Sequence, residues 1–150
     1  MAESTWIELL EVRLQVDRIL AFVSGDPALG GIVSFFGATR GESDEVHGPL
    51  LRLEYEAYRS MALNQLEELT QNAMRRWGAG RVAILHRLGP VGVGECSVAI
   101  AVACPHRAEA FEACRWLIDE LKREVPIWKK DVFADGAMQW VEPDPNEQRA

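Results

Sequence analysis

The sequence CPHRAEAFEACRWLIDELKREVPIWKKD, residues 104–131, decides much of the fold because it reads as one helix followed by a basic extended segment. Pro105 suits the first turn of a helix, since its missing N–H would have no partner there. Pro126 disfavours the helical conformation of the residue before it, so the helix should begin near His106 and end near Glu124. The face that packs on a core is marked by apolar residues three and four apart: Ala110, Phe111, Cys114, Leu117, Ile118 and Leu121.

A β-hairpin is predicted directly after this helix. Residues 127–142, IWKKDVFADGAMQWVE, read as two short strands on either side of Asp135-Gly136. This dipeptide favours the positive φ angles that a tight hairpin turn requires.

The chain before residue 104 alternates strands with two further helices. In the strand near residue 53, Leu51, Leu53 and Tyr55 should share the buried face, because side chains alternate along a strand. The order of elements predicts an α+β sandwich, with helices packed on a mixed, mostly antiparallel sheet and a topology similar to a split βαβ unit. Strands are predicted at residues 10–16, 31–37, 50–58, 81–88 and 95–104, helices at 17–23 and 60–77, a mobile acidic loop at 41–49, and a Gly/Pro-rich turn at 89–94.

The composition indicates one compact domain. A chain of 150 residues that is 48% hydrophobic can bury an ordinary core without disulfides or metals. We expect this domain to span residues 1–142, and the polar tail at 143–150 to be disordered.

Charge and cysteine content exclude several classes of protein. The net charge of −7 argues against nucleic acid or an anionic membrane as the main partner. Three cysteines without a C-x-x-C pair indicate neither a disulfide framework nor a zinc site, and no cofactor or metal is expected. No apolar run approaches the about 18 residues that a membrane helix needs, so a cytoplasmic location is predicted.

The candidate functional residues are cations, and each has an ordinary structural explanation. A lysine in the last helical turn complements the helix dipole, and lysines on a strand can protect its edge from pairing. Cations at a helix start oppose the dipole, and a bound anion would offset that cost. The set comprises Arg40, His106, Arg107, Lys122, Lys129 and Lys130.

The length of the helix predicts a homodimer. At 1.5 Å rise per residue, Arg107 and Lys122 lie roughly 22 Å apart along one helix. One chain cannot bring both ends to one small ligand, so a shared site requires two copies across a two-fold axis.

The sequence resembles the large, catalytic subunit of molybdopterin synthase from about residue 30 to residue 142. The resemblance rests on FFGATR, LEYEAY, RVAILHRLG, PHRAEAFEA, LKREVPIWKK and the closing WVE, which occur in the family's order. It implies an α/β hammerhead-type fold and a homodimer within a heterotetramer. It also implies sulfur transfer to cyclic pyranopterin monophosphate from the C-terminal Gly-Gly thiocarboxylate of a small ubiquitin-like carrier, which forms the dithiolene of molybdopterin.

The same resemblance assigns roles to residues. It implies that Lys122 is the principal catalytic lysine and Lys129 the second. Binding of the substrate's anionic end would fall to cations, which suit it by charge-assisted hydrogen bonds. The substrate-binding set is Ala38, Thr39, Arg40, His106, Arg107, Lys130 and Asp131, with Ala38 and Thr39 standing where the family would have a lysine or another residue and a valine.

Two alternatives come from other classes of function. In the first, Cys104 carries sulfur as a persulfide beside His106, although a buried inert thiol is the commoner case. In the second, the protein is a regulatory module that binds a small anion or a ubiquitin-like tail without turnover. The two lysines disfavour this module, since Arg40, His106 and Arg107 could serve binding alone. We read His86, Tyr55, Tyr58 and the five tryptophans as core or interface residues, and not as site residues.

Overall fold

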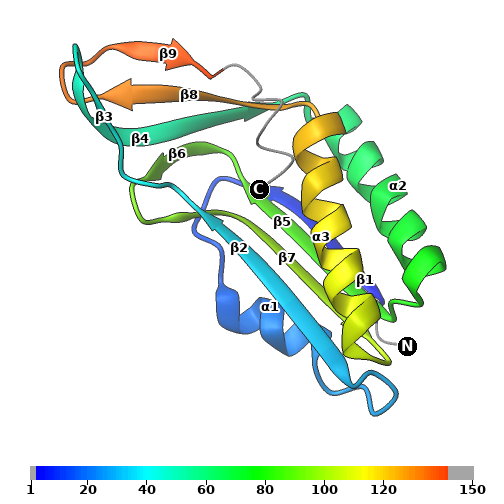
Figure 1. Ribbon diagram of the computed structural model, residues 1–150. Helices are drawn as coiled ribbons and strands as arrows, with labels where there is room; N and C mark the ends of the chain where they lie inside the picture. Colours follow the sequence, from blue (N-terminus) through cyan, green and yellow to red (C-terminus); the bar gives the residue numbers. More distant parts are fainter. Residues whose placement is uncertain (1–2, 142–150) are drawn as a thin grey trace.

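The computed structural model describes residues 3–141, which form two β-sheets and three α-helices (Figure 1). In the first sheet the strands lie in the order β1-β5-β7-β2; β1 and β5 run parallel, and the other neighbours are antiparallel. These strands are β1 (Thr5–Leu10), β2 (Gly31–Ala38), β5 (Arg81–Arg87) and β7 (Cys96–Cys104).

The second sheet lies beyond one end of the first and is antiparallel throughout (Figure 1). Its path is β3-β4-β8-β9, and β6 pairs with β4 off this path. The strands are β3 (Ser43–Asp44), β4 (Gly48–Ala57), β6 (Gly89–Gly92), β8 (Ile127–Phe133) and β9 (Met138–Trp140).

The helices cover both faces of the first sheet. Helices α2 (Arg59–Trp77) and α3 (Arg107–Glu124) pack side by side on one face, and α1 (Val16–Val23) packs on the other (Figure 1). Strand β7 is an inner strand of this sheet and is covered on both faces. Its large apolar residues join the core under α2 and α3, and its alanines join the core under α1. The predicted α+β sandwich with a mixed, mostly antiparallel sheet is confirmed.

Helix α3 has the predicted bounds. His106 is its N-cap and Val125 its C-cap, so the flanking prolines mark its ends as expected. The predicted apolar stripe is one residue too wide, because Phe111 is 62% exposed. The other five stripe residues are buried.

The first strand was predicted in the wrong place. Of the alternating residues 10–16 only Leu10 belongs to β1, whose residues 5–10 pair in parallel with β5. Val12 is exposed and Val16 already begins α1, for which Gln15, and not Asp17, is the N-cap. Alternation alone missed the strand because pairing with β5, far away in sequence, fixes its position.

Three further predictions for the second sheet need correction. The ladder between β4 and β8 shifts register between Leu50 and Arg52, so Leu51 is 48% exposed and does not share the buried face of Leu53. The Gly/Pro-rich turn contains strand β6, because its backbone pairs with β4. The expected loop at 41–49 contains β3, and its His47 Nδ1 lies 2.7 Å from Asp135 Oδ2 in the β8–β9 turn.

The hairpin of β8 and β9 is confirmed, with Gly136 at a φ of 89° in its turn. The predicted disordered tail, 143–150, lies outside the described residues. Within residues 3–141, none of the helices is both long and apolar enough to cross a membrane.

Candidate active site

Lys122 and Lys129 lie at the same end of the molecule, where α3 runs into β8 (Figure 1). Lys122 is in the last turn of α3, because Pro126 ends the helix just beyond it. Lys129 is on β8 opposite Tyr55 of β4, on the strand face that packs toward the core under α2 and α3. Both lysine charges act on His86 of β5, so they share one neighbourhood.

His86 lies buried at this junction, with 4% of its surface exposed. Its ring makes an edge contact with Tyr55 at 4.9 Å between centroids, and its Nδ1 lies 2.8 Å from the carbonyl oxygen of Arg87. Burial chiefly lowers the pKa of His86 to about 4; the hydrogen bond to Arg87 opposes this shift, and Lys122 and Lys129 add to it. His86 is therefore a neutral side chain beneath two lysines at pH 7.

The sequence prediction of His86 as a core residue is confirmed, but its closeness to the two lysines was missed. No local pattern signals this closeness, because His86 lies on β5 of the first sheet, whereas Lys122 lies near the end of α3 and Lys129 on β8 of the second sheet.

Neighbouring residues of β8 point to opposite faces of the sheet, which divides the basic segment. Asp131 shares the face of Lys129; its pKa is raised by burial and by the charge of Glu42, and lowered by Lys129. Lys130 points the other way, with its Nζ 3.5 Å from Glu54 and 5.3 Å from the centre of the Trp140 ring. The structure therefore groups Asp131, and not Lys130, with Lys129.

Arg40 lies just past the end of β2, at the same end of the molecule as Lys122. Strand β2 is antiparallel to β7, and α3 follows β7, so the end of β2 and the end of α3 point the same way (Figure 1). The Arg40 side chain is 85% exposed and pairs with Glu42 at 2.9 Å. Since Glu42 also acts on Asp131, Arg40 belongs to the neighbourhood of β8.

Ala38 and Thr39 precede Arg40, and they differ in how far they are buried. Ala38 is the exposed last residue of β2, where the register with β7 shifts. Thr39 is 3% exposed, and its buried Oγ1 has no hydrogen-bond partner in the structure. The backbone of Thr39, and not its side chain, is what holds this turn in place.

His106 and Arg107 lie at the opposite end of α3 and are exposed. Their backbone rests on Gly31, where an added Cβ would lie 2.7 Å from the Arg107 nitrogen. The helix between Arg107 and Lys122 is roughly 22 Å long at the standard rise. One copy of the chain therefore places Lys122, Lys129, Asp131 and Arg40 in one neighbourhood, and we call these four residues the lysine end. His106 and Arg107 lie apart from the lysine end of the same copy.

The cysteines are free thiols, and burial raises their pKa values. For Cys104 the pKa rises to about 11, mainly by burial and further through Glu109. Such a thiol carries almost no thiolate at pH 7, which disfavours the persulfide alternative. Within residues 3–141 there is no group of three His, Cys, Asp or Glu residues placed to hold a metal ion.

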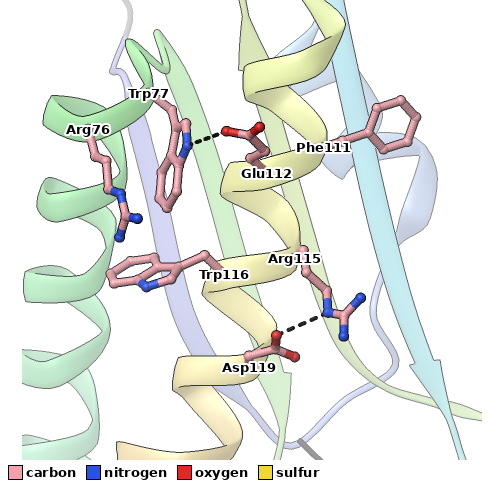
Figure 2. Close-up of a pocket in the computed structure, with 7 residues that line it drawn as sticks. All are labelled: Arg76, Trp77, Phe111, Glu112, Arg115, Trp116 and Asp119. Atoms are coloured by element: carbon pink, nitrogen blue, oxygen red, sulfur yellow. Dashed lines mark hydrogen bonds and ion pairs between the residues drawn. The ribbon is translucent and has the colours of Figure 1, made fainter. Parts of the chain in front are cut away.

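An open groove of about 450 Å³ lies between α2 and the middle of α3 (Figure 2). Trp77 and Trp116 lie 5.4 Å apart in it, and the Trp77 indole N–H donates to Glu112 at 3.0 Å. None of the residues of the lysine end lines this groove. Its lining comprises Arg76, Trp77, Phe111, Glu112, Arg115, Trp116 and Asp119.

The fold and this site define a class of protein: an α+β sandwich with a cationic site where the end of a helix meets a second sheet. The family model described as MoaE protein matches residues 9–124, and the chain belongs to this family. The family assignment agrees with the sequence resemblance.

Relatives from distant organisms extend this similarity. A molybdopterin synthase catalytic subunit of Arabidopsis thaliana is 46% identical over 143 residues, covering 93% of this chain and 70% of the relative. Another from Thermoplasma volcanium is 44% identical over 137 residues, covering 91% of this chain and 98% of the relative.

Solved structures show the same fold. Molybdopterin synthase from Staphylococcus aureus superimposes with a TM-score of 0.82 at 32% identity, covering 90% of this chain and 96% of that chain. A chain in a complex of subunits 1 and 2 of molybdopterin-converting factor from Helicobacter pylori also shares the fold. It has a TM-score of 0.74 at 20% identity, covering 91% of this chain and 90% of that chain.

Proposed function

We propose that this protein is the catalytic subunit of a molybdopterin synthase. It transfers sulfur from the C-terminal thiocarboxylate of a small ubiquitin-like carrier to cyclic pyranopterin monophosphate and forms the dithiolene of molybdopterin. The observation that carries this proposal is that Lys122 and Lys129 both act electrostatically on the buried His86, in a chain that belongs to the MoaE family.

The charges at the lysine end suit this chemistry. Both reactants are anions, and lysine ammonium groups attract the carrier's thiocarboxylate and stabilise the oxyanion that forms when sulfur leaves its acyl group. Because His86 stays neutral, it adds no third positive charge that would raise the cost of holding the two lysines together. The guanidinium of Arg40 can hold the phosphate in a bidentate manner.

A homodimer completes the site in this proposal. The separation of Arg107 from Lys122 within one copy supports it, because a two-fold axis that sets two α3 helices antiparallel brings the two ends together. Residues 114–115 are the midpoint between the two ends, and Phe111 and Arg115 are exposed near it. Two such dimer sites, each with one carrier, make a heterotetramer.

The free thiols support a reducing compartment, and we propose that the protein acts in the cytoplasm. Its partners there are the carrier and the cyclic pterin.

The decisive experiment supplies the purified protein with thiocarboxylated carrier and cyclic pyranopterin monophosphate, and measures the dithiolene product. We expect Lys122→Ala to lower the single-turnover rate by about 10²-fold or more, as for removal of a group that stabilises developing charge. Arg123→Ala is the matched control, since Arg123 is the next residue on α3 and pairs with Glu120 and Glu124.

A normal rate for Lys122→Ala, or an equal loss for Arg123→Ala, would rule out the assigned role of Lys122. Carrier binding without any product from the wild-type protein would favour the non-catalytic binding module instead.

A further inference from the structure

Glu95 is the centre of a polar network between β6 and β7 that has no role in the function described so far. Its carboxylate lies 2.8 Å from Arg87 Nη1 and 3.4 Å from Arg13 Nε through one oxygen, and accepts from the Gly92 N–H at 3.1 Å through the other. The Arg87 hydrogen bond is the main cause of the lowered pKa of Glu95, so this carboxylate is ionised at neutral pH. Arg87 is the buried partner, with 13% of its side chain exposed, whereas Arg13 is exposed.

The backbone of the same turn clamps Thr39. The Thr39 N–H donates to the Glu95 carbonyl at 3.0 Å, and the Gly94 N–H donates to the Thr39 carbonyl at 2.8 Å. The Glu95 N–H in turn donates to the Gly92 carbonyl at 3.0 Å, which closes the turn on itself. Both backbone polar groups of Thr39 are therefore fixed by the segment that the Glu95 carboxylate holds.

Arg40, the next residue, has no comparable support of its own. Its side chain is exposed, and its pair with Glu42 joins two side chains that are both largely in water. Such exposed pairs fix geometry weakly. The direction in which Arg40 leaves the chain is thus set by the clamped backbone of Thr39.

The network also connects to the lysine end. The carbonyl of Arg87 is hydrogen-bonded to the ring of His86, while its guanidinium holds Glu95. Arg87 therefore links the histidine beneath Lys122 and Lys129 to the Gly92–Glu95 turn, which holds the backbone of Thr39.

We propose that Glu95 is a positioning residue: held by Arg87, it fixes the Gly92–Glu95 turn, clamps the backbone of Thr39, and so directs Arg40 toward the anionic end of the substrate. The assignment of Arg40 as the substrate's anion-binding residue rests on the proposed function. The clamp itself rests only on the hydrogen bonds described above.

The test compares Glu95→Gln with wild type in dithiolene formation. The amide keeps the size of the side chain and loses the charge-assisted bond to Arg87. We expect KM for the cyclic pterin to rise about tenfold while kcat changes less than about twofold, because a lost hydrogen bond to a charged group is worth roughly this factor and the lysines are untouched.

A double-mutant cycle separates positioning from general destabilisation. If Glu95 acts through Arg40, then Glu95→Gln changes KM little in an Arg40→Ala background. Glu112→Gln is the matched control, since Glu112 also accepts a side-chain hydrogen bond but lies in the groove between α2 and α3. It should leave KM and kcat unchanged. Fully additive effects of Glu95→Gln and Arg40→Ala would overturn the proposal.

A second measurement, amide hydrogen exchange, does not depend on the enzymatic activity of the protein. Hydrogen exchange of the Thr39 and Gly94 amides should accelerate about tenfold or more in Glu95→Gln, and remain at the wild-type rate in Glu112→Gln. Unchanged exchange of the Thr39 amide in Glu95→Gln overturns the proposal. Absence of product from the wild-type protein would overturn the proposed function instead, and the exchange measurement would still decide whether Glu95 holds the turn.

Discussion

His86 is the residue whose chemistry the tertiary structure changes most. A free imidazole would be partly charged near neutral pH, but burial beneath Lys122 and Lys129 lowers the pKa of His86 to about 4. The protein thus keeps a titratable side chain neutral beside the two lysines.

This shift predicts how stability depends on pH. Below the ordinary pKa of 6.5 the unfolded chain binds a proton at His86, and the folded chain does not do so until about pH 4. The contribution of neutral His86 to the free energy of unfolding is therefore complete above pH 6.5 and is lost as the pH falls toward 4. The loss is on the order of 3 kcal/mol. Urea unfolding across this range should show a flatter pH dependence for His86→Gln than for wild type. Equal slopes for the two proteins would contradict the assignment.

A second prediction at this scale concerns Cys104. Its thiol is fully buried, and burial raises its pKa to about 11, so it should not carry sulfur. Cys104→Ala should form dithiolene from preformed thiocarboxylated carrier within about twofold of the wild-type rate, since a persulfide needs a reactive thiolate. A loss of all product, in a variant whose unfolding midpoint matches wild type, would revive the persulfide mechanism.

At the scale of elements, the packing of the start of α3 against β2 determines where His106 and Arg107 lie. A Cβ at residue 31 would lie 2.7 Å from the Arg107 nitrogen, too close for the helix start to keep its position. We expect Gly31→Ala to destabilise the protein by about 1–3 kcal/mol, as overpacking does, in urea unfolding.

The control for this substitution is Gly41→Ala. Its added Cβ would meet only the Val93 side chain at 3.5 Å, an ordinary contact, and neither glycine has a positive φ. Neither substitution requires a positive φ, so the comparison tests the steric fit at residue 31. Equal stabilities of Gly31→Ala and Gly41→Ala would show that α3 is not tightly seated.

At the scale of the whole molecule, the proposed site is divided between two copies, and this division can be tested by complementation. Lys122→Ala and Arg107→Ala should each be weakly active. Mixed and allowed to exchange subunits, they should recover about one quarter of the wild-type sites, because half of the dimers are mixed and each has one intact site.

Mixing Lys122→Ala with Arg40→Ala is the matched negative case. Arg40 and Lys122 belong to the same end of one chain, so every site in a mixed dimer lacks one of them. Recovery in this mixture, or none in the first one, would contradict the division of the site.

The parts of the fold that were predicted correctly are those with local causes. Pro105 and Pro126 limit the helix between them, and Asp135-Gly136 marks the hairpin turn, since each acts on its own backbone. The predictions that failed concern pairing between distant segments: the position of β1, the register shift of β4 at Leu51, and the existence of β6.

The sequence by itself determined the α+β class, the bounds of α3 and the family, because prolines, periodic apolar residues and ordered motifs are properties of short segments. Only the tertiary structure decided that the charges of Lys122 and Lys129 both act on a neutral His86, that Lys130 faces away, and that the backbone of Glu95 holds Thr39, the residue before Arg40. The physical reason is that these relations arise where two sheets and a helix end pack together. Burial, side-chain direction and charge at that junction depend on residues far apart in the chain.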